Sequence, residues 1–197
     1  MNVPNRLTMG RIVLTPIFML LMLIEFKYHF AVAMVVFIVA SVTDLIDGKL
    51  ARKNHLVTDF GKFLDPLADK MLTTAAYIGF IYTYRGEAVY SLIITLVTFV
   101  VLFREFAVSS IRLVSVSSGG KVIAANIWGK LKTVVQMVSL IAALFLNALK
   151  DIIKLPETLI VSLEIIVLSL FVISGVLCIL SGIIYLFGAK EYINPSK

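Results

Sequence analysis

The sequence has very little cysteine. Cys178 is the single cysteine among 197 residues, so no internal disulfide can form, and it lies in an apolar run where we expect a small buried or lipid-facing side chain. Internal repeats, low-complexity tracts and soluble appendages are also missing from the sequence. We therefore expect one domain over residues 1–197.

Apolar residues dominate what is present. Hydrophobic residues make up 60% of the chain, and the mean hydropathy is +1.01. A soluble domain of this size could not bury so much apolar side chain, so we expect an all-α integral membrane protein. We expect no cleavable signal peptide, because Pro16 interrupts the first apolar run and no small-residue cleavage site follows it.

Six uncharged runs predict six transmembrane helices. Most of these runs are shorter than the roughly 20 residues that cross about 30 Å of hydrocarbon. Each becomes long enough if its helix continues into neighbouring polar residues. The expected helices lie near residues 7–26, 30–52, 61–84, 88–115, 125–149 and 158–189.

Lysine and arginine are distributed unequally between the two sides of this bundle. If the N-terminus is inside, only Lys27, Arg85, Lys150 and Lys154 fall on the outer side. The positive-inside rule then places both termini in the cytoplasm, in a multi-pass protein of the cell membrane. We expect the basic inner face to contact anionic lipid headgroups and not nucleic acid, because its charges are tied to helix ends.

Four acids lie where the second expected helix ends and the third begins: Asp44, Asp47, Asp65 and Asp69. Their spacings of three and four place each pair on one face of its helix, and the short connection predicts antiparallel neighbours whose acidic faces converge. Such carboxylates would repel unless cations join them, and two divalent cations would neutralise all four. The oxygen-only donors favour Mg²⁺ or Mn²⁺ over Zn²⁺. Ordinary ion pairs with nearby lysines and arginines are the alternative.

Small residues accompany the acids. Gly48 and Ala51 leave one stripe of the second helix without bulk, and Gly61 precedes Asp65 by four positions. A flat ring or a phosphate could approach the backbone there. Close helix packing is the alternative interpretation.

The full pattern is similar to the complete signature of the CDP-alcohol phosphatidyltransferases, including the length of its spacer. It reads Asp44-x-x-Asp47-Gly48-x-x-Ala51-Arg52, then eight residues, then Gly61-x-x-x-Asp65-x-x-x-Asp69. That family has a six-helix membrane fold, which agrees with the number of helices expected above. The resemblance implies transfer of a phosphatidyl group from CDP-diacylglycerol to an alcohol with release of CMP. It also implies a homodimer.

The resemblance implies a role for each residue of the pattern. The four aspartates would hold the metal, and Asp69 would also act as general base toward the acceptor hydroxyl. The small residues would leave room for the cytidine, while Arg52 would stabilise the arrangement of the site or bind the nucleotide. The residues given these nucleotide roles are Gly48, Ala51, Arg52 and Gly61.

The N-terminal stretch "PNRLTMGR" resembles the Asn-x-Leu-Thr-x-x-Arg opening of many family members. The matching residues are Asn5, Leu7, Thr8 and Arg11. We expect a short interfacial segment beside the nucleotide site, with Asn5 among the nucleotide-binding residues. For Arg11, an equally open interpretation is a positive charge that only fixes the orientation of the helix in the membrane.

A cluster of cations at the inner ends of the fourth and fifth expected helices could hold a dianionic phosphate. Its members are Arg104, Arg112, Lys121, Lys130 and Lys132. Positive-inside anchoring is the alternative, but Arg104 would lie below the headgroups, where a charge kept only for anchoring is costly. With Glu105, Gln136 and Met137, the pattern resembles the phosphatidylglycerophosphate synthase branch, whose acceptor is sn-glycerol 3-phosphate.

Two other functions stay open at this point. One is another branch of the same family, such as a phosphatidylinositol-phosphate or phosphatidylserine synthase. The other is a divalent-cation transporter, although no matching set of acids occurs in the other half of the chain, as inverted repeats would supply. Glu164, a lone acid early in the sixth expected helix, has no assignment from the sequence.

Overall fold

Six helices account for almost all of the described chain. The computed structural model describes residues 2–53, 59–117 and 127–189, apart from the side chains of 3–4, 45–53, 59–60, 62–63, 114–117 and 189. No strand occurs in these ranges, so the expected all-α fold is confirmed. The helices are α1 (Val3–Leu23), α2 (His29–Lys53), α3 (Asp59–Thr83), α4 (Ala88–Ser117), α5 (Ile127–Ile152) and α6 (Glu157–Ala189).

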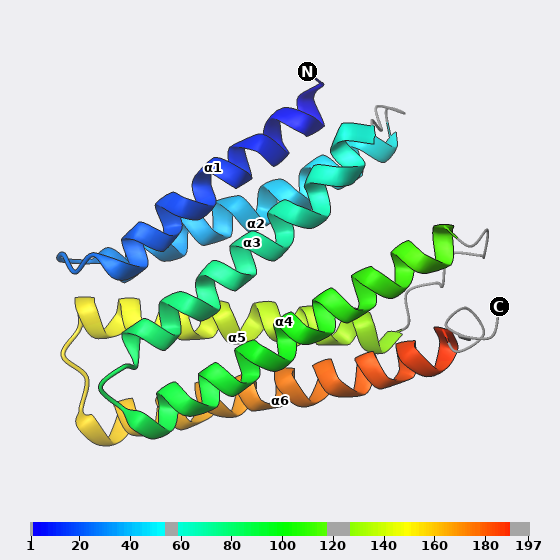
Figure 1. The fold of residues 1–197 in the computed structure, drawn as a ribbon. Coiled ribbons are helices and arrows are strands. Elements are labelled where there is room, and N and C mark those ends of the chain that lie inside the picture. Colours follow the sequence, from blue (N-terminus) through cyan, green and yellow to red (C-terminus); the bar gives the residue numbers. More distant parts are fainter. Residues whose placement is uncertain (1, 54–58, 118–126, 190–197) are drawn as a thin grey trace.

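The helices fall into two groups, α1 to α3 and α4 to α6 (Figure 1). In the first group α1 packs along both α2 and α3, whereas α2 and α3 touch each other only slightly. In the second group α6 packs against both α4 and α5, and contacts of α2 with α5 and of α3 with α4 join the groups. The expected direct pairing of the two acid-bearing helices is therefore largely replaced by packing through α1.

The bundle has two distinct ends. At one end, on the right of Figure 1, α1, α3 and α5 begin and α2, α4 and α6 end. We call this the motif end, because Asp44 and Asp65 lie toward it. At the other end, the far end, the short connections 24–28, 84–87 and 153–156 join successive helices.

Helix α1 begins at Val3, earlier than the expected residue 7. Proline stands in its first turn, where the missing backbone N–H costs no hydrogen bond and the fixed φ suits a helix. The Asn5-to-Arg11 stretch consequently belongs to α1 itself and does not form a separate interfacial segment.

The surface of the bundle is strongly apolar. Four stretches are long and apolar enough to cross a membrane: Asn5–Leu23, Ala88–Leu113, Ile127–Ile152 and Glu157–Gly188. The apolar stretch of α2, His29–Asp44, is shorter. Large apolar side chains such as Phe99, Phe103 and Phe187 are mostly exposed, as expected where lipid replaces water as the solvent. The chain is a multi-pass membrane protein.

Buried aromatic side chains pack helices against one another both within the first group and between the two groups. The Phe18 and Phe37 rings join α1 to α2 with centroids 5.4 Å apart, and the Phe80 and Phe171 rings join α3 to α6 at 5.8 Å. All four side chains are fully buried. This packing fixes the helices on which the polar residues of the motif end are mounted.

Candidate active site

A polar face of α1 is buried against the motif end of the bundle. Asn5, Thr8, Arg11 and Thr15 recur at three- and four-residue spacing, and each is less than a tenth exposed. Arg11 is only 1% exposed, which is unusual for an arginine and requires a compensating charge. The sequence therefore places a cation on the inner face of α1, where the acids of the pattern lie.

Two contacts tie this face to the acids. Arg11 Nη1 forms an ion pair with Asp44 Oδ1 of α2. Thr8 Oγ1 donates a hydrogen bond to Asp65 Oδ1 of α3 at 2.7 Å. Helix α1 thus links the first acid of the pattern to the third. The buried position of Arg11 favours a role in the site over topology anchoring.

The remaining residues of the pattern are placed as follows. Gly61 is buried, and Asp69 is exposed one helical turn beyond Asp65, within electrostatic reach of Asp44 and Arg11. The other members lie on α2, but their side chains are outside the described part of the chain: Asp47, Gly48, Ala51 and Arg52. Their metal-binding and nucleotide-binding roles stay predictions.

The donor atoms fit a hard divalent cation in their chemistry. Asp44, Asp65 and Asp69 offer only carboxylate oxygens, the ligands that Mg²⁺ and similar ions prefer. Among the described residues, no three acidic, histidine or cysteine side chains lie close enough to hold one ion. A complete ligand set would therefore need groups beyond those described, and Asp47 is the predicted one.

A cavity of about 810 Å³ opens beside Asp69, between α1, α3, α4 and α5. Its polar lining includes Asp69, Lys70, Arg104, Glu105 and Lys132. The rest of its wall is mostly apolar, with Ile12, Pro16, Met71, Leu102, Phe106 and Met137 among the lining residues. The size and the few convergent polar groups are typical of ligand sites.

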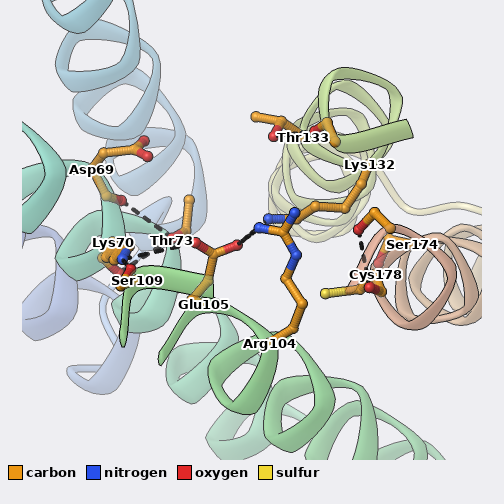
Figure 2. Close-up of polar contacts among 12 residues, drawn as sticks. Asp69, Lys70, Thr73, Arg104, Glu105, Ser109, Lys132, Thr133, Ser174 and Cys178 are labelled. Carbon is orange, nitrogen blue, oxygen red and sulfur yellow. Dashed lines mark hydrogen bonds and ion pairs between the residues drawn. The ribbon is translucent and has the colours of Figure 1, made fainter. Parts of the chain in front are cut away.

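Three cations from three helices surround one acid on the wall of this cavity. Glu105 Oε1 accepts hydrogen bonds from Lys132 Nζ and, at 3.0 Å, from Arg104 Nη1. Lys70 Nζ lies 3.9 Å from Glu105 Oε2 and donates to Ser109 Oγ. Figure 2 shows Glu105 between Arg104 on one side and Lys70 with Ser109 on the other.

The predicted phosphate cluster is only partly assembled by the structure. Arg104 and Lys132 meet at the cavity, but Arg112 and Lys130 are exposed and are not among its lining residues. Lys121 lies outside the described residues. The sequence does not predict Lys70 as a member of this cluster, because a lysine near the cytoplasmic end of a helix is explained equally well by the positive-inside rule. Its position directly after Asp69 was the available signal.

Two glycines of α6 face α4 within the same chain. An added Cβ at Gly175 would lie 3.3 Å from a methyl carbon of Val97, and at Gly182 it would lie 3.1 Å from Cγ of Arg104. The seven-residue spacing therefore marks packing of α6 on α4. At Gly182 this packing holds the aliphatic stem of Arg104 beside the cavity.

Comparisons with known proteins agree with the pattern of acids. Residues 1–180 match the profile of the family described as CDP-alcohol phosphatidyltransferase. The chain is 42% identical over 168 residues to the CDP-diacylglycerol–glycerol-3-phosphate 3-phosphatidyltransferase of Bacillus subtilis (strain 168), covering 79% of this chain and 82% of the relative.

Two further relatives carry the same name. The protein of Pseudomonas fluorescens is 36% identical over 149 residues, covering 73% of this chain and 72% of its own. That of Yersinia pestis (strain Pestoides F) is 37% identical over 146 residues, covering 74% and 78%. With a family match over nearly its whole length, the chain belongs to the CDP-alcohol phosphatidyltransferases, a family of membrane-bound, divalent-metal-dependent transferases.

Proposed function

We propose that the protein transfers the phosphatidyl group of CDP-diacylglycerol to sn-glycerol 3-phosphate, giving phosphatidylglycerophosphate and CMP. The observation that carries this proposal is the cavity that Asp69 shares with Lys70, Arg104 and Lys132. It places a carboxylate able to accept a proton beside cations able to bind a phosphate. The names of the three relatives support the same donor and acceptor.

The acceptor hydroxyl attacks the phosphorus that bears the diacylglycerol. A new P–O bond forms to the acceptor, the P–O bond to CMP breaks, and CMP leaves with the bonding electron pair. Asp69 accepts the hydroxyl proton, a role that its exposure toward the cavity allows. A positioned base of this kind contributes roughly 100- to 10,000-fold to the rate.

The acids and small residues around α1 form the donor side of the proposed site. Asp44, Asp47, Asp65 and Asp69 would hold two Mg²⁺ or Mn²⁺ ions, which when bound supply positive charge to the diphosphate. Arg11 and Thr8 orient Asp44 and Asp65 for this task. The proposed nucleotide-binding residues are Asn5, Gly48, Ala51, Arg52 and Gly61.

The cation cluster forms the acceptor side. Arg104, Lys132 and Lys70 would bind the phosphate of sn-glycerol 3-phosphate through charge-assisted hydrogen bonds. Arg112, Lys121 and Lys130, which the sequence predicts in the same cluster, would add positive potential that draws the anionic acceptor to the motif end. We place this end at the cytoplasmic face of the cell membrane, together with both termini. A homodimer is part of the proposal.

The test is CMP release by purified protein from labelled CDP-diacylglycerol with different acceptors. We expect metal-dependent release with sn-glycerol 3-phosphate, and little with serine, inositol phosphate or glycerol. EDTA should abolish it. A preference for serine or inositol phosphate would instead assign another branch of the family. Divalent-cation uptake into proteoliposomes without CMP release would indicate a transporter.

A further inference from the structure

Glu105 is an unexpected residue in a site for an anionic acceptor, because a carboxylate repels a phosphate. Its side chain is 21% exposed and lines the cavity that contains Asp69. It is nevertheless fully engaged with cations, since Oε1 contacts Lys132 and Arg104 while Oε2 faces Lys70. The carboxylate therefore already has partners of its own.

The three cations reach Glu105 from different helices. Lys70 belongs to α3, Arg104 to α4 and Lys132 to α5 (Figure 2). Without a shared acid these like charges would repel, and their long side chains would keep many rotamers. The contacts with Glu105 hold the charged groups of three helices at fixed positions.

Lys132 depends most on this contact. It is only 5% exposed, so its ammonium group has lost most of its hydration and needs a nearby negative charge. Glu105 supplies that charge. Because three cations share one carboxylate, the cluster keeps a net positive charge that can act on a bound phosphate.

Arg104 is confined from a second side. The absence of a side chain at Gly182 lets α6 approach the Arg104 stem, and an added Cβ would meet Cγ at 3.1 Å. The side chain is thus held at its stem by α6 and at its guanidinium by Glu105. Fixing a cation before the ligand arrives removes part of the entropic cost of binding.

From these contacts we propose that Glu105 is the positioning residue of the acceptor site. Its carboxylate holds Lys70, Arg104 and Lys132 as a preformed receptor for a phosphate dianion, and so selects an acceptor that carries a phosphate. This inference rests on the function proposed above. It adds that the specificity depends on an acid and not on the cations alone.

The experiment compares Glu105→Gln and Glu105→Asp with the wild type in the CMP-release assay. Glu105→Gln keeps an acceptor atom but loses the charge, so the KM for sn-glycerol 3-phosphate should rise about tenfold or more, the effect of one lost charge-assisted hydrogen bond. The KM for CDP-diacylglycerol should stay within about twofold, because the donor contacts are untouched. Glu105→Asp, which keeps the charge, should restore part of the loss.

Glu164→Gln is the matched control, because Glu164 is likewise an acid paired with a lysine of α5 but lies at the far end. Its two KM values should stay at the wild-type level. An unchanged acceptor KM in Glu105→Gln, or an equal rise in both KM values, would overturn the proposal. If Glu105→Gln fails to fold, Glu105→Asp decides by the same two KM values.

Calorimetry with inorganic phosphate separates this inference from the proposed reaction. We expect the wild type to bind phosphate and Glu105→Gln to bind it about tenfold more weakly, whichever acceptor the enzyme uses. A wild type that binds phosphate but releases no CMP with sn-glycerol 3-phosphate refutes the reaction alone. Equal phosphate affinity in both proteins refutes the role of Glu105 alone.

Discussion

Helix α5 contributes a lysine to each of two partly buried ion pairs, and one of the two pairs borders the candidate site. Lys132 contacts Glu105 at the motif end, and Lys150 contacts Glu164 at the far end. The two lysines are five helical turns, or about 27 Å, apart on the same face of the helix. The two pairs have the same chemistry, so their surroundings must account for the difference between them.

At the far end, the groups around the ion pair are other side chains of the protein. Lys150 Nζ also lies 5.9 Å from the centre of the Tyr84 ring, and the Tyr84 hydroxyl accepts a hydrogen bond from Asn147 at 3.2 Å. The motif-end pair has two additional cations and borders the cavity with Asp69. An ion pair becomes a candidate binding site when the cations around it outnumber the acids and a cavity makes those cations accessible to a ligand.

The largest effect should come from the acid that shares the cavity with the motif-end pair. We expect Asp69→Asn to lower the rate of CMP release by roughly 100- to 10,000-fold, because it keeps the shape but removes the proton acceptor. Metal-dependent binding of CDP-diacylglycerol should persist in this variant and be lost in Asp44→Asn. Calorimetry with Mg²⁺ and with EDTA measures both, and near-normal turnover by Asp69→Asn would exclude it as the base.

Removal of the buried cation of α1 should cost stability as well as activity. Arg11→Met removes the buried partner of the Asp44 carboxylate, and because that carboxylate is 36% exposed and partly hydrated, we expect a loss of about 1–3 kcal/mol. Thermal unfolding in detergent should show a clear loss. Arg85→Met is the control, because the Arg85–Glu25 pair at the far end is exposed and worth about 0–1 kcal/mol. Equal unfolding temperatures for the two variants would contradict the role given to Arg11.

The two α5 lysines test the comparison directly. Lys132→Gln should reduce kcat/KM for sn-glycerol 3-phosphate by about tenfold or more, through loss of a charge-assisted hydrogen bond to the phosphate. Lys150→Gln should lower the unfolding temperature while leaving both KM values unchanged, since its pair has no ligand to bind. If Lys150→Gln impairs acceptor use as strongly as Lys132→Gln, the two ends do not differ as described.

The smallest effect should come from the glycine behind Arg104. Gly182→Ala places a Cβ against the Arg104 stem and should raise the acceptor KM about two- to fivefold, corresponding to roughly half to one kcal/mol. Gly188→Ala is the matched control, because no atom lies within 4 Å of an added Cβ there. Steady-state kinetics of both variants with sn-glycerol 3-phosphate would detect the difference, and an identical KM would show that Arg104 is not confined by α6.

Periodicity and charge were sufficient to predict the helices and the end at which the acids gather. Hydrophobic runs depend only on local sequence, and the positions of Asp44 and Asp65 relative to those runs place both at one end. The nearness of Arg104 and Lys132 was also predictable, since each lies toward the same end of an expected helix.

The family resemblance predicted that the N-terminal stretch lies beside the site, but the packing of α1 against both α2 and α3 was not predictable, because tertiary packing decides which helices become neighbours. The sequence shows polar residues at helical spacing, at Asn5, Thr8 and Arg11. An ordinary membrane-helix start with a positive charge that fixes its orientation would show the same pattern. Glu164 had no assignment for a similar reason, since its partner Lys150 lies on another helix. The three partners of Glu105 likewise come from elements that no local pattern connects.

The measurement that tests the account most directly is the kcat/KM of the wild-type protein for sn-glycerol 3-phosphate and for glycerol, at the same concentration of CDP-diacylglycerol. The two acceptors differ only in the phosphate that the Lys70, Arg104 and Lys132 cluster is proposed to bind. Loss of two charge-assisted hydrogen bonds, each worth about 1.5–3 kcal/mol, predicts a preference of at least about a hundredfold for sn-glycerol 3-phosphate. Comparable values for the two acceptors would contradict the account.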